Sequence, residues 1–114
     1  MNVDGINSFL DDFKSKMKIW DIIFRDDRGK NFQSLIDLEI SSAYRKEILE
    51  KLKSEDYSEG PLEDKLNNST ELWVFGKEVK GKEVYIKISI GNFNSPVICI
   101  SFHIAEHKMK YPLK

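Results

Sequence analysis

The residues whose types are best suited to catalysis or metal binding lie in the stretch His103-Ile104-Ala105-Glu106-His107, which reads H-x-x-E-H. That spelling matches the zinc-binding motif of inverted zinc peptidases. Two histidines four residues apart can share a zinc ion when a helix carries them, but the residues before His103 alternate like a strand. An extended strand would hold His103 and His107 about 13 Å apart. The sequence therefore favours a strand that ends near His103, and a zinc hydrolase is kept only as a third hypothesis.

A second constellation comes from two alternating segments, residues 84–90 and 97–104. In both segments apolar side chains occupy every second position, with polar side chains between them. We expect an antiparallel hairpin that keeps isoleucine opposite isoleucine, since a slip of one residue would reverse the faces. The opposed pairs on the other face are then Tyr85–His103, Lys87–Ser101 and Ser89–Cys99.

This polar face suits the cleavage of RNA by its own 2′-hydroxyl, which needs a base, an acid and positive charge on the phosphate. His103 can act as acid or base, Lys87 can hold the phosphate, and Tyr85 can donate a hydrogen bond or stack on a base. Ser89 and Ser101 would add hydrogen bonds to the substrate. The chemistry requires no metal or cofactor. The solvated side of an ordinary half-buried sheet would show the same alternation. A face that is only the solvent-exposed side of the sheet is therefore the alternative interpretation.

Other residues could help to bind such a substrate. Glu59 could reach the polar face and activate the 2′-hydroxyl, although a helix stop with a Gly-Pro turn is the simpler explanation of residues 56–61. Lys108 and Lys110 could contact phosphates, or they could form a solvated basic tail. Phe93, in the connection after residue 90, could stack on a base or contact a protein partner.

The elements that must position these residues are predicted to be helices followed by strands. Residues 4–17 place apolar side chains at spacings of three and four, as in an amphipathic helix capped by Asp4. Residues 19–24 favour a short buried strand that includes Trp20. Next we expect a short helix through Leu35 and Leu38, a helix capped by Ser41 or Ser42, and a loop over residues 56–69.

An antiparallel meander of three strands is expected to complete the chain, with strands at residues 72–76, 84–90 and 97–104. The predicted fold class is therefore α+β, with N-terminal helices packed on a small antiparallel sheet to which residues 19–24 could add a strand. Trp73 and Phe75 are expected in the core, and Tyr111 and Leu113 are expected to fold back over the sheet.

Composition limits the classes of function. The 114 residues suit one domain, and the single cysteine, Cys99, is predicted to be a buried thiol in a reducing compartment. We see no signal peptide or membrane span and expect a cytoplasmic protein. Residues 1–64 carry a net charge of −5 and residues 65–114 a net charge of +4. A basic half suits a polyanion such as RNA, or it could belong to a surface that averages to neutral.

Three short pieces of the second half are similar to one known family. Leu72-Trp73, Val84-Tyr85-Ile86-Lys87 and Ile100-Ser101-Phe102-His103, after a helix that ends near Asp56-Tyr57, resemble the motility quorum-sensing regulator (MqsR) family of toxins. The resemblance covers roughly residues 40–104. Members of this family are mRNA interferases of toxin–antitoxin systems, with an α+β fold similar to that of the RelE-type ribonucleases.

The resemblance implies an mRNA substrate, a protein antitoxin as partner, and catalytic roles for Tyr85 and Lys87. The family's catalytic lysine falls on His103 here. A second family lysine falls near Glu59, which reverses the charge, and a polar family position is Val74. The alternative function is a binding module without enzymatic activity, which would use the sheet face or edge to dock a protein.

Overall fold

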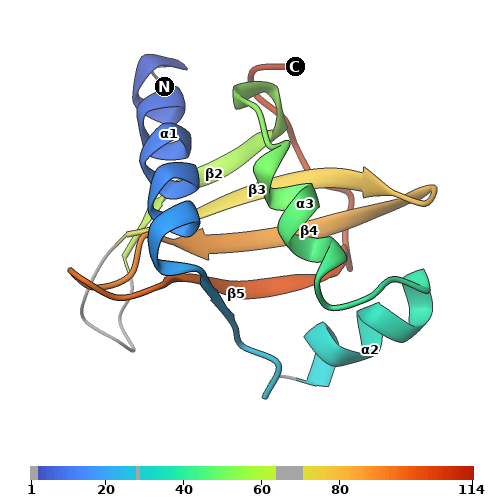
Figure 1. Cartoon of the computed structure of the whole chain (residues 1–114). Coiled ribbons are helices and arrows are strands. Elements are labelled where there is room, and N and C mark those ends of the chain that lie inside the picture. Colours follow the sequence, from blue (N-terminus) through green and yellow to red (C-terminus); the bar gives the residue numbers. More distant parts are fainter. Residues whose placement is uncertain (1–2, 28, 64–70) are drawn as a thin grey trace.

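The computed structural model describes residues 3–27, 29–63 and 71–114. Its five-stranded sheet has the order β1-β5-β4-β3-β2, in which β1 is parallel to β5 and all other neighbours are antiparallel (Figure 1). The elements are α1 (Val3–Trp20), β1 (Ile22–Phe24), α2 (Gly29–Leu38), α3 (Tyr44–Glu50), the 3-10 helix η1 (Ser54–Asp56), β2 (Tyr57–Leu62), β3 (Leu72–Val79), β4 (Lys82–Ser89) and β5 (Val97–Ile104). The predicted α+β class and the three-stranded meander are confirmed, and β1 and β2 extend the sheet on either side.

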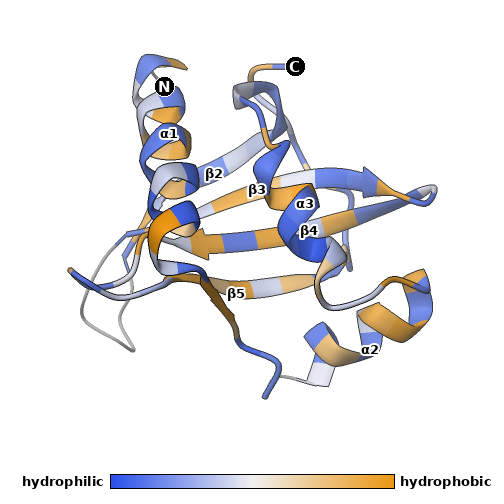
Figure 2. Ribbon diagram, viewed as in Figure 1, coloured by the Kyte–Doolittle hydropathy of each residue, from blue (hydrophilic) through white to orange (hydrophobic). Residues whose placement is uncertain are grey.

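Helices α1 and α3 cover one face of the sheet (Figure 1). Helix α1 has an apolar stripe (Figure 2), and this stripe buries the side chains that the spacing predicted: Ile6, Phe9, Leu10, Phe13 and Met17. Asp4 lies inside the first turn of this helix and not at the predicted cap position. A carboxylate in the first turn interacts favourably with the helix dipole. Among the described residues, no helix combines the length and the apolar character of a membrane span.

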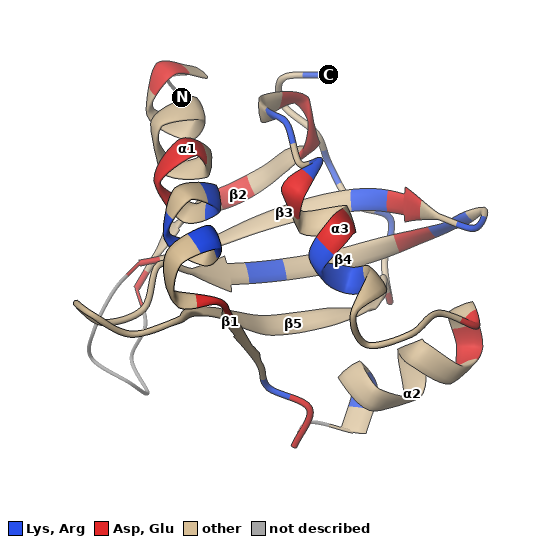
Figure 3. Ribbon diagram, in the orientation of Figure 1, with Lys and Arg blue, Asp and Glu red and all other residues tan. Residues whose placement is uncertain are grey.

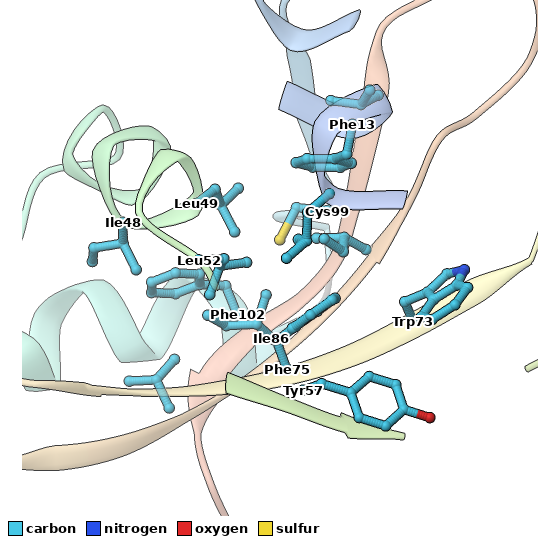
Figure 4. Close-up of a cluster of buried hydrophobic side chains, with 14 of the residues drawn as sticks. Phe13, Ile48, Leu49, Leu52, Tyr57, Trp73, Phe75, Ile86, Cys99 and Phe102 are labelled. Carbon is cyan, nitrogen blue, oxygen red and sulfur yellow. The ribbon is translucent and has the colours of Figure 1, made fainter. Parts of the chain in front are cut away.

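The core between the helices and the sheet is dominated by aromatic and branched side chains (Figure 4). Phe13, Phe75 and Phe102 are fully buried, and Phe9 stacks on Trp73 with ring centroids 4.7 Å apart. Cys99 lies in this core, where burial raises the pKa of its thiol to about 12. The prediction of a buried thiol is confirmed, and a thiol of this kind stays protonated and unreactive at neutral pH.

Strand β5 contains a bulge that the alternation did not predict. Lys87 pairs with Ser101, but the next residue of β4, Ile88, pairs with Cys99, so Ile100 is an extra residue in β5. The bulge turns Cys99 toward the same core as Phe102, although the strict alternation had placed Cys99 on the polar face. The predicted Ser89–Cys99 pair is therefore wrong, and Ser89 pairs with Ile98 instead.

The segment predicted as a loop from residue 56 forms an edge strand, β2, which pairs with β3. Gly60 and Pro61 suggested a turn, but an edge strand tolerates a proline because the missing N–H removes no bond from the interior of a sheet. Residues 64–69 of the predicted loop lie outside the described part of the chain. The correction matters for function, because β2 carries Glu59.

The first strand is shorter than predicted, because α1 continues to Trp20. The Trp20 side chain is 42% exposed, so the prediction of a core position for this residue is wrong. Trp73 and Phe75 are buried as expected, and Leu113 packs against the core. Ser41 accepts a hydrogen bond from the Tyr44 N–H, but the residue at the cap position of α3 is Ala43, so the predicted cap at Ser41 or Ser42 is wrong.

Helix α2 takes the place of a neighbouring strand along the outer edge of β5. Strand β1 pairs only with residues 97–99, and beyond that point Asn31 donates to the Ile100 carbonyl and accepts from the Phe102 N–H, at 2.9 and 3.0 Å. Ser34, one turn later, accepts from the Ile104 N–H. These bonds satisfy buried backbone groups that would otherwise be costly, and they fix α2 beside the end of β5.

We expect Asn31→Ala to lower the free energy of unfolding by about 2–6 kcal/mol, since two buried backbone groups lose their partner at about 1–3 kcal/mol each. Urea unfolding followed by circular dichroism measures this loss. The matched control is Asn7→Ala on the exposed side of α1, where a change within about 0.5 kcal/mol is expected. Equal stabilities for the two variants would show that Asn31 does not brace β5.

Candidate functional site

The sheet face opposite the helices carries the predicted polar residues in two adjacent rows. One row crosses four strands through the directly paired positions Glu59, Val74, Lys87 and Ser101. The next row runs from Gly76 through Tyr85 to His103. The pairs Tyr85–His103 and Lys87–Ser101, predicted from the parity of the alternation, are confirmed. Because neighbouring strands lie about 4.8 Å apart, the backbone of Lys87 stands about 5 Å from β5 and about 10 Å from β2.

These rows form the floor of a hollow of about 580 Å³, which we call the sheet pocket. Most of the candidate residues chosen from the sequence line it, namely Glu59, Tyr85, Lys87, Ser101, His103, Lys108 and Lys110. It is also lined by Ser58, Val74, Glu106, His107 and Met109. Glu106 and His107 are exposed, and they contribute to its wall. Both residues follow the end of β5, and the alternation of polar and apolar residues within a strand does not predict where side chains beyond its end will lie.

Three side chains are packed together at the centre of the sheet pocket. The rings of Tyr85 and His103 are stacked, with centroids 5.3 Å apart and planes 15° apart. The Lys87 ammonium lies 5.8 Å from the centroid of the Tyr85 ring, on the limit of a cation–π contact. An imidazole, a phenol and an ammonium group are therefore held within reach of a single bound phosphate.

A contact with the backbone determines which ring nitrogen of His103 carries a proton. Its Nδ1 lies 3.0 Å from the Ile104 carbonyl oxygen, which can only accept a hydrogen bond, so Nδ1 carries a proton. The second nitrogen, Nε2, is then the one that gains or loses a proton. The ring can serve as a base through Nε2 when it is neutral and as an acid through Nε2–H when it is charged.

Glu59 is held on the pocket side of β2 by the residues around it. Tyr57 turns into the core, where it lies edge-on to Trp73 and Phe75, and its hydroxyl donates to the Gly60 carbonyl. Burial, followed by the charge of Glu59, raises the pKa of Tyr57, so this hydroxyl stays a donor. The bond joins Tyr57 to Gly60 across the segment that contains Glu59, and the exposed Glu59 side chain belongs to the row that contains Lys87.

The chain after β5 folds back across the same face and closes one side of the sheet pocket. Glu83 of β4 holds it with both carboxylate oxygens, which accept from the Met109 N–H at 3.0 Å and the Tyr111 hydroxyl at 2.7 Å. Burial and this bond raise the pKa of Tyr111. The predicted return of Tyr111 over the sheet is confirmed, and the anchor places Lys108 and Lys110 beside the pocket.

The path of the chain after β5 depends on the absence of a side chain at Gly76. A Cβ atom there would lie 2.2 Å from the Tyr111 hydroxyl, so Gly76→Ala must displace the ring. We expect trypsin to cut this variant after Lys108 and Lys110 several times faster than the parent protein. Gly5→Ala on α1, where a Cβ atom meets nothing within 4 Å, is the matched control. Unchanged cleavage in both variants would contradict the anchoring role of Tyr111.

Two expectations from the sequence need correction or closer definition. Ser89, a predicted substrate ligand, is buried and accepts a hydrogen bond from the Gly91 N–H at 3.1 Å, and it does not line the sheet pocket.

His103 lies in β5, as predicted, and not on a zinc-binding helix. Glu106 pairs with Lys30 at 2.7 Å, which lowers the pKa of the Glu106 carboxyl. In the described ranges, no three His, Cys, Asp or Glu side chains gather as a metal site.

Comparisons with protein-family models, with curated proteins and with solved structures found no match for this chain. The resemblance to the MqsR family therefore rests on the short sequence pieces quoted above. What the chain itself offers is a pocket in which acidic, basic and hydrogen-bonding groups face one another.

Proposed function

We propose that this protein is a metal-independent endoribonuclease that cleaves RNA through attack by the 2′-hydroxyl. The observation that carries the proposal is the row Glu59–Val74–Lys87–Ser101 with His103 beside it, because it places a cation between two groups that transfer protons. A phosphate at Lys87 would have the Glu59 carboxylate on the β2 side and the His103 ring on the β5 side. In-line displacement at phosphorus needs this order of base, phosphate and acid.

In the proposed reaction Glu59 takes the proton of the 2′-hydroxyl, and the 2′-oxygen attacks the adjacent phosphorus. His103 gives its Nε2 proton to the departing 5′-oxygen as the P–O5′ bond breaks. The products are a 2′,3′-cyclic phosphate and a 5′-hydroxyl, and no electrons or further reactants are needed. Lys87 stabilises the extra negative charge on the equatorial oxygens, which exists only near the transition state.

The remaining lining residues support binding. Ser101 can donate its hydroxyl proton to a phosphate oxygen, and the hydroxyl of Tyr85, whose ring is stacked on His103, can donate to the same ligand. Val74 is small and apolar, which leaves the space between Glu59 and Lys87 open for the ribose. Lys108 and Lys110 add positive charge at the rim, where the phosphates of a longer strand would pass.

The family resemblance supports a more specific role, which we include in the proposal. The protein would act in the cytoplasm as a toxin that cleaves mRNA, and a protein antitoxin would neutralise it. Phe93 is 91% exposed in the connection between β4 and β5, and it suits such a partner because it lies outside the sheet pocket.

Induced expression in a bacterial host tests this role. The wild-type chain should arrest growth and shorten the lifetime of mRNA, whereas Lys87→Met should do neither while it accumulates to the same level. Lys82→Met, an exposed lysine on the same strand outside the pocket lining, is the matched control and should remain toxic. Growth arrest by all three proteins alike would argue against cleavage as its cause.

A further inference from the structure

A second hollow lies on the other side of His103, between β5 and α2. Strand β5 has β4 along one edge and, past the end of β1, helix α2 along the other. A groove of about 330 Å³ runs here, and we call it the α2 groove; its lining includes Lys30, Gln33, Ser34, Asp37, His103 and Ile104. A smaller hollow of about 310 Å³ next to it is lined by Ser101 and His103, which also line the sheet pocket.

His103 is therefore a shared wall between the sheet pocket and the α2 groove. Glu106 also lines both, so a ligand that spans them would pass beside the imidazole and the Glu106 carboxylate; the imidazole is the group proposed to protonate the leaving oxygen. In an RNA strand, the nucleotide that follows or precedes the cleaved phosphate would then lie in the α2 groove. The volume of the groove is at the lower end of the range for small-molecule sites, which suits one base with its sugar.

The chemistry of the α2 groove suits a base better than a phosphate. Lys30, Gln33 and Asp37 follow one another at helical spacing, and α2 is basic where it begins and acidic toward its end (Figure 3). The Lys30 ammonium is already paired with Glu106, which also lines the groove. Two carboxylates beside one lysine would repel a phosphate, but a carboxylate accepts readily from the amino group of a base.

Two side chains of the groove are arranged to read such an amino group. The Gln33 amide donates to Asp37 Oδ1 at 3.0 Å, which holds the two groups together in the lining of the groove. A carboxylate has several lone pairs, so Asp37 keeps acceptor capacity for an exocyclic N–H. The neighbouring residues Asn31 and Ser34 are engaged with the backbone of β5, so the helix that carries Gln33 and Asp37 is held at a fixed distance from His103.

We propose that the α2 groove is a nucleobase subsite in which Asp37 and Gln33 select a base with an exocyclic amino group beside the cleaved phosphate. The inference rests on the proposed ribonuclease function, and it adds which part of the molecule sets the sequence preference.

The test is the cleavage of a randomised RNA pool, followed by sequencing of the product ends. Wild-type protein should prefer a base with an amino group at one position next to the cut, and Asp37→Asn should reduce that preference about tenfold. The matched control is Asp11→Asn, the same change on the exposed surface of α1, which should leave the preference intact. Cleavage by Asp37→Asn with the wild-type preference would overturn the inference and leave the ribonuclease proposal standing.

A second measurement separates the two proposals if no RNA is cut. Titration with the four nucleoside 3′-monophosphates, followed by amide NMR, should shift the signals of residues 29–37 and Ile104 for the preferred base, and Asp37→Asn should weaken that response. With these shifts and no cleavage, the subsite stands and the enzyme proposal fails. Without shifts for any of the four nucleotides, the subsite is refuted as well.

Discussion

His103→Ala should lower the rate of RNA cleavage by about 10²- to 10⁴-fold, the usual contribution of a general acid or base. The reason is geometric, because His103 Nδ1 is held by the Ile104 carbonyl and only Nε2 faces the chemistry. Single-turnover cleavage of a labelled RNA with excess protein measures this step without interference from product release. The loss should appear in the rate constant for cleavage rather than in the affinity for the RNA.

His107→Ala is the natural control for that experiment. This residue is also a histidine at the rim of the sheet pocket, but it follows the end of β5 and has no partner position in the sheet rows. We expect a far smaller loss of cleavage than for His103→Ala, with similar melting temperatures for both variants. Equal losses would show that the pocket does not depend on the position that β5 gives to His103.

Arg45→Met should destabilise the fold by about 3 kcal/mol, at the lower end of the cost of breaking a buried ion pair. The Arg45 side chain is fully buried, its guanidinium makes two bonds of 2.7 and 2.8 Å to Asp26, and it lies 3.8 Å from the centroid of the Phe24 ring. The lower end applies because the Asp26 side chain is 36% exposed and can regain water. In a thermal melt the loss corresponds to roughly 10 °C.

Lys46→Met, the next residue of α3, is the matched control. Its ion pair with Asp21 is exposed on the Asp21 side, with Asp21 70% exposed, so a change within about 1 kcal/mol is expected. Similar melting temperatures for Arg45→Met and the parent protein would mean that packing in this region does not depend on the guanidinium.

The same ion pair should make stability depend on pH in acid. Arg45 holds the pKa of Asp26 below its ordinary value of 3.8, so the folded state binds this proton less readily than the unfolded state. The stabilisation is therefore complete above the ordinary carboxyl range and is lost as the pH falls below about 4 toward the lowered value. Asp26→Asn should be less stable at pH 7 and should lose less stability between pH 5 and pH 3. An equal loss of stability between pH 5 and pH 3 in both proteins would contradict this assignment.

The sequence predicts the site best where one face of a strand is wet and the other is dry. From Tyr85 to Lys87 and from Ser101 to His103, polar and apolar residues alternate, and the pairing follows from that contrast. The prediction fails at Cys99, because β5 is mostly apolar from Val97 to Ile100. A bulge there exchanges one apolar residue for another, so the pattern carries no sign of it.

The positions of two other side chains could not be predicted from the sequence, for different reasons. Glu59 sits in a Glu-Gly-Pro sequence that is typical of a turn, and only the pairing of β2 with β3 places it in the row with Lys87. Arg45 reads as one more surface charge, since arginine is seldom fully buried. Its ion pair joins α3 to the turn after β1, and a contact between segments so far apart cannot be inferred from local spacing.

The most direct test of the ribonuclease proposal is the incubation of purified protein with a labelled RNA and with its all-deoxy counterpart, both in excess EDTA. The proposed mechanism predicts that the RNA is cut to fragments with 2′,3′-cyclic phosphate and 5′-hydroxyl ends, that the DNA stays intact, and that His103→Ala protein cuts the RNA at least about 100-fold more slowly. An uncut RNA, or cleavage that EDTA abolishes, would contradict a metal-independent ribonuclease.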